Sequence, residues 1–204
     1  MARPASGFVY ATTGADYTTL ARRAARSLRL AMPDARVDLF TDQNIADPVF
    51  DRIHRLSDSW FRPRMEAMRR TRFDRTAFLD ADTIVLADVS ALFALLDRYE
   101  FAGCQAMAQP MNLHHSQPWI PHSFPYLNGG MLVARKSSRI RSLATDWERT
   151  LRRHGLVRDQ ATLRALLHDR HIRFQVVPPE YNLIQLERLD HWLVDDSPTA
   201  TMSL

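Results

Sequence analysis

Two carboxylates, Asp80 and Asp82, stand one residue apart in the segment FLDADT, at the end of an apolar run that is typical of a buried strand. Two ionised acids at this spacing repel each other and raise a pKa unless a cation neutralises them. Mg²⁺ and Mn²⁺ bind one or two protein carboxylates together with phosphate oxygens of a substrate. Asp80 and Asp82 are therefore predicted metal ligands. The alternative is an ordinary turn after a strand, where Asp is common.

Two further groups of residues could contact a ligand. Asn128, Gly129 and Gly130 precede an apolar run, where the glycines let a ligand approach the backbone and the Asn amide offers a donor and an acceptor. Asp159 and Gln160 open a predicted helix, where Asp159 either caps the helix or accepts hydrogen bonds from sugar hydroxyls. Taken alone, the first group also fits a tight turn and the second a helix cap.

The composition excludes several chemistries. The 204-residue chain has one cysteine, Cys104, which rules out an intrachain disulfide framework and a multi-cysteine zinc site and fits a reducing cytoplasm. The 27 basic and 23 acidic residues give a net charge of +4. All the basic residues except Lys136 are arginines scattered among acids, a pattern more typical of codon usage in a GC-rich genome than of a designed electric field. Interleaved aromatic and basic residues are missing, so no nucleic-acid partner is predicted.

One local group of arginines stands out, consisting of Arg62, Arg64, Arg69, Arg70, Arg72 and Arg75. It indicates either a solvated helix face or a basic wall beside a phosphate site. No run approaches the roughly 20 apolar residues that a membrane helix needs, and residues 1–7 lack the charged and apolar regions of a secretion signal. We therefore expect a cytoplasmic protein without a transmembrane segment.

The elements that must position these residues follow from periodicity. Residues 7–13 and 36–41 are predicted strands, and residues from 18 to Pro33 form an amphipathic helix between them. This order is a βαβ unit, which predicts an α/β fold with a parallel sheet covered by helices. Further strands are predicted at 76–79, 83–86, 101–104 and 173–177, and another in the segment 127–134 directly after its two glycines. Further helices are predicted after Pro63 and at 91–98, 137–153 and 159–167. Residues 42–60 are predicted to be rich in loops.

Residues 105–126 contain four prolines and three histidines and are predicted to form a long functional loop. Adjacent histidines such as His114 and His115 usually point apart, which favours a surface loop over a metal site there. No internal repeat or convincing linker divides the chain. We therefore expect a single domain over residues 1–204, with residues 195–204 as a mobile polar tail.

Five segments occur in the order typical of GT-A glycosyltransferases: FVYATTGADY, FLDADTIVLADVSALF, YLNGGMLVARKS, RDQATLRALL and VVPPEYN. The chain is most similar to glycosyltransferase family 8, the group with galactinol synthase and glycogenin, over most of residues 7–182. The resemblance implies a Rossmann-like, mostly parallel GT-A sheet. It also implies metal-dependent transfer of a sugar from a nucleotide-diphosphate donor, a UDP-sugar, to an unknown hydroxyl acceptor, with retained anomeric configuration. A Rossmann dehydrogenase is disfavoured, because Gly14 is the only glycine after the first strand.

The resemblance also implies roles for individual residues. The nucleotide-binding residues would be Ala11, Thr12, Thr13, Asp16, Tyr17, Arg64 and Asp80. The cofactor would be Mn²⁺ or Mg²⁺, bound by Asp80 and Asp82. The residues bordering the donor sugar would be Asn128, Gly129 and Gly130. Asp159 and Gln160 would bind sugar hydroxyls near the anomeric carbon and act as the catalytic residues. Independently of the resemblance, the 105–126 loop is the natural place for acceptor selection, because loops on a rigid sheet vary most freely.

One departure from the family pattern affects the metal site. Family 8 enzymes take a third ligand, a histidine, from near the C-terminus, and here no histidine follows Val194. The nearest, His191, belongs by sequence to a helix or loop. Either the metal site is completed differently, or the product is shortened and the catalytic lid is absent. The rival interpretation is a non-catalytic nucleotide-sugar-binding protein of the same fold, which lost turnover with the missing ligand. A nucleotidyltransferase would need a Gly-rich, basic phosphate loop near the first strand, which this chain lacks.

Overall fold

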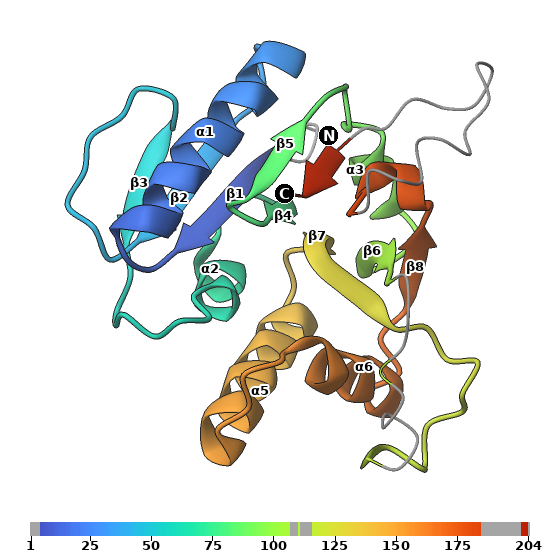
Figure 1. The fold of residues 1–204 in the computed structure, drawn as a ribbon. Coiled ribbons are helices and arrows are strands. Elements are labelled where there is room, and N and C mark those ends of the chain that lie inside the picture. The colour runs from blue at the N-terminus through green and yellow to red at the C-terminus, as the bar shows by residue number, and fades with distance from the viewer. Residues whose placement is uncertain (1–4, 107–109, 111–115, 185–200, 204) are drawn as a thin grey trace.

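The computed structural model describes residues 5–106, 110, 116–184 and 201–203. Within these residues a seven-stranded sheet runs through the molecule in the order β3-β2-β1-β4-β7-β6-β8 (Figure 1). Its strands are β1 (Ser6–Thr12), β2 (Val37–Thr41), β3 (Arg52–Arg55), β4 (Arg75–Leu79), β6 (Phe101–Gln105), β7 (Leu127–Arg135) and β8 (Phe174–Val177). A separate two-stranded sheet pairs β5 (Thr83–Val85) with β9 (Thr201–Ser203).

The sheet is mixed, with a parallel majority. β1 lies parallel to β2 and β4, β2 is parallel to β3, and β6 is parallel to β8. β7 runs antiparallel to both of its neighbours, β4 and β6. The predicted α/β class and the first βαβ unit are confirmed. Because β7 is reversed, its first residues lie at the carboxyl end of β4, where ligands bind in open α/β sheets.

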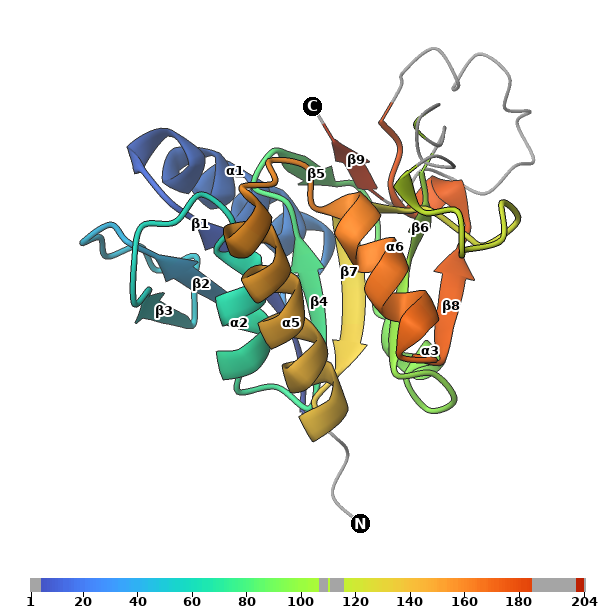
Figure 2. The same cartoon turned by 90° about the horizontal axis from the view of Figure 1, so that it is seen from below.

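Helices cover both faces of the sheet, as the two views together show (Figures 1 and 2). The helices are α1 (Ala15–Ala31), α2 (Arg64–Arg70), α3 (Leu92–Leu95), α5 (Ser138–His154) and α6 (Gln160–Asp169), with a 3₁₀ turn, η1, at Pro179–Tyr181. Successive residues of a strand point to opposite faces, so Tyr10 joins the core beneath α1 while Val9 joins the core beneath α2 and α5. In the described part of the chain, no helix combines the length and apolarity needed to cross a membrane.

The structure differs from the sequence predictions at four elements. β3 lies within residues 42–60, which were expected to be loop-rich. Asn128, Gly129 and Gly130 lie inside β7 rather than before it, so the tight-turn interpretation of these residues is wrong. The predicted 91–98 helix is shorter, with α3 followed by turns. Residues 201–203 of the expected mobile tail pair with β5, whereas residues 195–200, His191, His114 and His115 lie outside the described residues.

Candidate functional site

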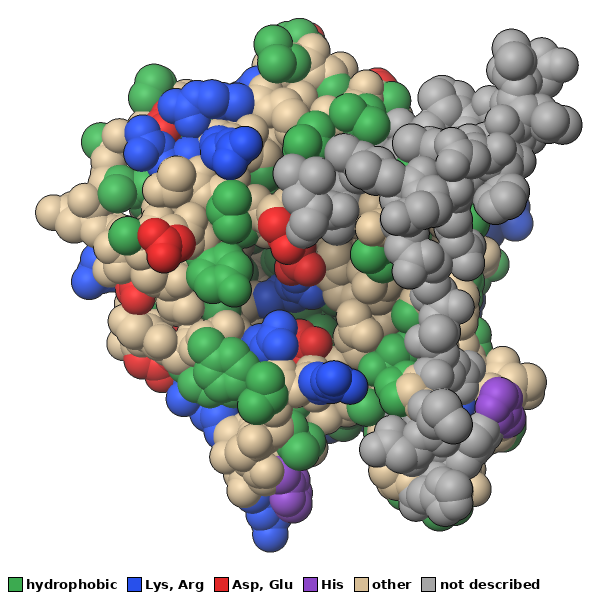
Figure 3. Space-filling view, viewed as in Figure 1, with side chains coloured by type: hydrophobic (Ala, Val, Ile, Leu, Met, Phe, Trp, Pro, Cys, Tyr) green, Lys and Arg blue, Asp and Glu red, His purple; other side chains and the backbone are tan. Residues whose placement is uncertain are grey.

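A cleft of about 340 Å³ lies where β4, β7 and the first turns of α2 and α6 meet. Figure 3 shows basic and acidic side chains gathered around a hollow near the middle of this face. The residues that line the cleft are Arg62, Arg64, Asp80, Pro110, Tyr126, Gly129, Arg158, Asp159 and Gln160. Five of these nine were predicted site residues, so the fold brings together residues that are up to 96 positions apart in the chain.

Arg64 joins α2 to the ends of β4 and β7. Its guanidinium forms an ion pair with the Asp80 carboxylate and donates a hydrogen bond of 2.5 Å to the carbonyl oxygen of Gly129. A Cβ atom at Gly129 would lie 3.1 Å from the Arg64 guanidinium, so a larger residue here would press on this arginine. The backbone N–H of Asp80 donates to the carbonyl oxygen of Gly130 at 2.9 Å. Strand pairing and one arginine thus fix Asp80 in the lining of the cleft.

The electrostatics of Asp80 indicate a place for a cation. Desolvation raises the pKa of the Asp80 carboxyl group; Arg64 opposes this shift, and the negative charges of Asp82 and Asp159 add to it. Asp82 has no hydrogen-bond or ion-pair partner among the described residues. Two carboxylates fit a divalent ion that takes its other ligands from a diphosphate. Over the same described residues, no group of three or more His, Cys, Asp or Glu side chains is placed to hold a metal.

Asp159 occupies the N-cap position of α6 but does not cap it. Its side chain accepts no capping hydrogen bond, and its carboxylate lies 3.6 Å from the Arg62 guanidinium. Its backbone is held instead, because the buried indole of Trp147 in α5 donates to the Asp159 carbonyl oxygen at 3.0 Å. The helix-cap interpretation of Asp159 therefore does not fit the geometry. Gln160, the first residue of α6, lines the same cleft.

Asn128 contacts protein groups rather than the cleft. Its amide oxygen accepts hydrogen bonds of 2.6 Å from the Gly130 backbone N–H and from the Asn182 amide. A Cβ atom at Gly130 would lie 2.6 Å from the Asn182 amide nitrogen, so this position requires glycine. Asn182 belongs to the VVPPEYN segment and is buried. The structure therefore gives Asn128 and Gly130 a structural role beside the cleft, and Gly129 alone of the three lines it.

The five residues predicted around the end of β1 do not line this cleft. The Thr12 hydroxyl is buried in a hydrogen-bonded chain with Thr18, at 3.0 Å, and from there to Thr41. Tyr17 is 61% exposed and Asp16 is exposed. Ala11 and Thr13 are partly buried. Their predicted nucleotide contacts remain a proposal.

Four cleft residues were not among the predicted site residues. Arg62 was noted only as part of the arginine group and Pro110 only as part of the 105–126 loop, whereas Tyr126 and Arg158 were not singled out. Arg62, Tyr126 and Arg158 each stand within two residues of a predicted site residue, which is the signal that could have identified them. Burial raises the pKa of the Tyr126 hydroxyl, and the negative charge of Asp159 adds to the shift.

The arginine group divides between two uses. Arg62 and Arg64 line the cleft, as the basic-wall interpretation expects. The other four arginines form ion pairs elsewhere on the molecule, with Glu148, Glu66, Asp38 and Asp97. These four do not form one solvated helix face either, because Arg72 and Arg75 lie outside α2 and the Asp38 and Glu66 carboxylates are buried.

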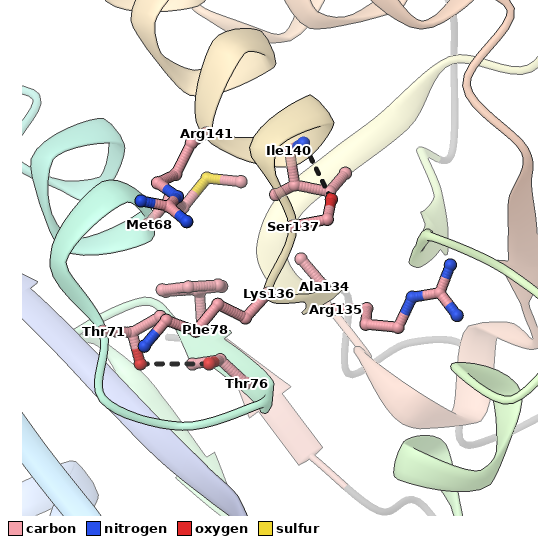
Figure 4. Close-up of a pocket in the computed structure, with 10 residues that line it drawn as sticks. All are labelled: Met68, Thr71, Thr76, Phe78, Ala134, Arg135, Lys136, Ser137, Ile140 and Arg141. Atoms are coloured by element: carbon pink, nitrogen blue, oxygen red, sulfur yellow. Dashed lines mark hydrogen bonds between the residues drawn. The ribbon is translucent and has the colours of Figure 1, made fainter.

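Other hollows lack the predicted site residues. A cavity beneath α2 and α5 has a volume of only about 10 Å³ (Figure 4), enough for about one water molecule. The hydroxyl groups around this cavity are hydrogen-bonded to neighbouring protein groups. The Thr71 and Thr76 hydroxyls pair at 3.1 Å, and the Ser137 hydroxyl caps α5 by accepting from the Ile140 N–H. A wider groove of about 1070 Å³ lies near the amino ends of β1 and β4 and contains none of the predicted residues.

Comparison with known proteins places the fold. No model of a known protein family matches the chain, and no characterised protein matches its sequence. Solved structures match over nearly the whole chain. The galactosyltransferase LgtC, in complex with donor and acceptor sugar analogs, superposes with a TM-score of 0.69 at 13% identity, covering 97% of this chain and 86% of LgtC.

Two other solved glycosyltransferases also match over nearly the whole of this chain. GlyE of Streptococcus pneumoniae TIGR4 gives a TM-score of 0.67 at 19% identity, covering 97% of this chain and 54% of GlyE. Mouse xyloside xylosyltransferase 1 gives 0.60 at 16% identity, covering 98% of this chain and 97% of that enzyme. The chain therefore has a GT-A-type fold like that of family 8 glycosyltransferases, and at these identities the likeness concerns the fold.

Proposed function

We propose that this protein is a glycosyltransferase that moves a sugar from a nucleotide-diphosphate donor, a UDP-sugar, to a hydroxyl acceptor. The observation that carries the proposal is the cleft itself. It combines the Asp80 carboxylate, the Arg64 guanidinium and the Asp159 carboxylate at the carboxyl edge of a GT-A-type sheet. The Asp159 carboxylate is available for a ligand because it makes no capping hydrogen bond to α6. Carboxylates accept hydrogen bonds from sugar hydroxyls, and arginine binds diphosphate oxygens.

In this proposal the donor spans the cleft. The diphosphate lies against Arg62, Arg64 and Arg158, which line one continuous surface. Asp80 and Asp82 would hold Mn²⁺ or Mg²⁺, which supplies positive charge to the diphosphate when bound. The base and ribose extend to the end of β1, toward Ala11, Thr12, Thr13, Asp16 and Tyr17.

The chemistry assigned to the chain is stabilisation of the leaving group. As the bond between the anomeric carbon and the diphosphate breaks, negative charge grows on the diphosphate, and the arginines of the cleft stabilise it. Asp159 and Gln160 bind the sugar near the anomeric carbon, bordered by Gly129, with Asn128 and Gly130 hydrogen-bonded to each other beside it. The acceptor hydroxyl replaces the diphosphate with retained configuration. A matched LgtC structure carries a Gln to Glu substitution described as an active-site mutation, which supports a glutamine in such a role.

A second candidate is a nucleotide-sugar-binding protein without turnover. It is favoured by the set of metal ligands, since the described residues supply two carboxylates for a metal and no third ligand. It is also favoured by the ion pair that Arg64 already makes with Asp80. Both candidates predict binding of the donor, and they differ only in whether the bond to the diphosphate is broken.

Two measurements separate these candidates. The first is a titration with uridine diphosphate, with and without Mn²⁺, and the second is an assay of slow hydrolysis of UDP-sugars. The transferase proposal predicts Mn²⁺-dependent binding and measurable hydrolysis. Binding without hydrolysis of any of several UDP-sugars would favour the second candidate. Absence of binding under all conditions would exclude both.

A further inference from the structure

Arg164 in α6 is a buried arginine that the proposed reaction does not use. Its side chain reaches residues 117–126, which we call the 117–126 loop, and makes four hydrogen bonds to it. It donates to the Gln117 amide oxygen at 3.0 Å, to the Pro121 carbonyl oxygen at 2.8 Å and twice to the Phe124 carbonyl oxygen at 3.2 and 3.3 Å. Arg164 is only 3% exposed.

The partners of Arg164 are all neutral. Across the described residues, no carboxylate forms an ion pair with this guanidinium, and burial lowers its pKa. Arginine nevertheless keeps its charge in proteins, so a full positive charge is buried against amide oxygens alone. Such burial costs free energy that an apolar side chain would not cost. Departures of this kind from the rules of stable packing are expected where function needs them.

Arg164 is the centre of a longer attachment between α6 and the loop. The Gln117 amide donates to the Ala161 carbonyl oxygen at 2.7 Å, in the first turn of the helix. At the other end, the Phe124 ring packs edge to face on His168 and Phe174, with ring centroids 5.1 and 5.5 Å apart. The loop is thus attached along the length of α6.

The attached loop leads into the cleft. It ends at Tyr126, which is 4% exposed, packs against Ala161 and lines the cleft with Asp159 and Gln160. The charges of Asp159 and Arg164 both act on the pKa of Tyr126, in opposite directions. Gln160 and Arg164 are four residues apart, on the same face of α6. One helix face therefore carries both a cleft residue and the attachment of the loop.

We propose that Arg164 is a positioning residue that makes the 117–126 loop and the first turns of α6 one rigid unit, and so holds Tyr126 beside Gln160 in the cleft. This inference rests on the proposed function for the chemistry performed there. Loss of Arg164 should leave the nucleotide end of the site intact and misplace the groups nearest the reacting sugar. A misplacement of about 1 Å can reduce turnover by about a hundredfold.

The test compares Arg164→Met and Arg164→Lys with the control Arg139→Met. Arg139 also donates to two carbonyl oxygens, those of Arg170 and His171, but at the far end of α6. Hydrogen exchange measured by mass spectrometry should show amides of the 117–126 loop exchanging at least about tenfold faster in Arg164→Met. The increase should be smaller in Arg164→Lys, which restores the charge and some donors, and absent in Arg139→Met.

Kinetics complete the test. In Arg164→Met, hydrolysis of the UDP-sugar should fall at least about tenfold in kcat while affinity for uridine diphosphate with Mn²⁺ changes less than about threefold, and Arg164→Lys should recover part of the loss. Unchanged loop exchange, or faster exchange throughout the sheet in both variants, would overturn the inference, as would normal turnover with a loosened loop. If the wild type binds no uridine diphosphate, the proposed function fails, and loop exchange still decides whether Arg164 holds the loop.

Discussion

Asp82 is the residue that tests metal binding with the least disturbance of the fold. It makes no hydrogen bond or ion pair within the described residues, whereas Asp80 is held by Arg64. We expect Asp82→Asn to lower affinity for uridine diphosphate in Mn²⁺ by about a hundredfold or more, because a metal-bridged contact is worth several kcal/mol. Calorimetry on both proteins, in Mn²⁺ and in chelator, checks this. Equal affinities in all four measurements would contradict the metal assignment.

Asp159 should act on the sugar and not on the nucleotide. Because its carboxylate makes no capping hydrogen bond, Asp159→Asn should change the free energy of unfolding by less than about 0.5 kcal/mol. UDP-sugar hydrolysis should fall at least about tenfold, with affinity for uridine diphosphate nearly unchanged. Kinetics, calorimetry and urea unfolding of the variant measure these quantities. A clear loss of stability with normal turnover would instead indicate that Asp159 caps α6 in solution.

Single residues were predictable where a motif places them at the end of an element. Asp80, Gly129, Asp159 and Gln160 follow or begin such elements, and they meet in the cleft. Contacts between distant segments were not predictable, because nothing in the sequence pairs Trp147 with the Asp159 carbonyl. The same reason applies to the use of the Asn128 amide by protein groups rather than by a ligand.

At the scale of elements, Asp47 joins α1 to the segment between β2 and β3. Its nearly buried carboxylate accepts from Arg22 at 2.6 Å, from Arg26 at 2.9 Å and from the Val49 N–H at 3.1 Å. Burial alone would raise the pKa of Asp47, but these donors outweigh it and hold the pKa below its ordinary value. A lowered folded-state pKa contributes stability above the unfolded pKa, about 3.9 for Asp, and that stability is lost as the pH falls through the folded value.

Asp47→Asn should therefore destabilise the protein by about 1–2 kcal/mol at pH 7, because Asn keeps the packing but loses the charge-assisted hydrogen bonds. The difference should shrink as the pH falls below the unfolded-state pKa of about 3.9 and through the lower folded-state pKa, because the wild-type carboxylate then becomes protonated as well. Urea unfolding of both proteins across this pH range measures it. Asp34→Asn, at an exposed position, is the control and should behave like the wild type. A difference that is independent of pH would mean that the charge of Asp47 contributes nothing.

Long amphipathic elements were predictable and short edge elements were not. α1 buries Ala21, Ala24 and Leu28 at the spacing that predicted it. β3 has four residues, lies at the sheet edge and has exposed arginines at both ends, so it lacks the apolar alternation that would indicate a strand. The glycines of β7 suggested a turn. They are in fact needed because Arg64 and Asn182 approach the strand backbone closely, and local sequence propensity carries no information on such tertiary contacts.

At the scale of the molecule, periodicity predicted the α/β class but not the direction of β7, since parallel and antiparallel strands that are buried on both faces have similar sequences. The reversal decides where the site lies. It places the start of β7 at the carboxyl end of β4, so that Gly129 and Asp80 share one cleft. The resemblance to GT-A glycosyltransferases supplied the fold that local patterns alone left open.

The melting temperature of the whole chain should depend on metal and nucleotide together. Two carboxylates with no third protein ligand among the described residues should bind a divalent ion weakly, and tightly only when diphosphate oxygens complete its coordination. Metal alone should then raise the melting temperature by less than about 1 °C. With uridine diphosphate at about a hundred times its Kd, binding adds about 2.7 kcal/mol, which corresponds to about 5–10 °C for a chain of this size. Thermal scans with metal, with nucleotide and with both distinguish these cases. If metal alone stabilises the protein as much as the pair does, the chain itself must supply a complete ligand set, with His191 the first residue to substitute in the search for the missing ligand.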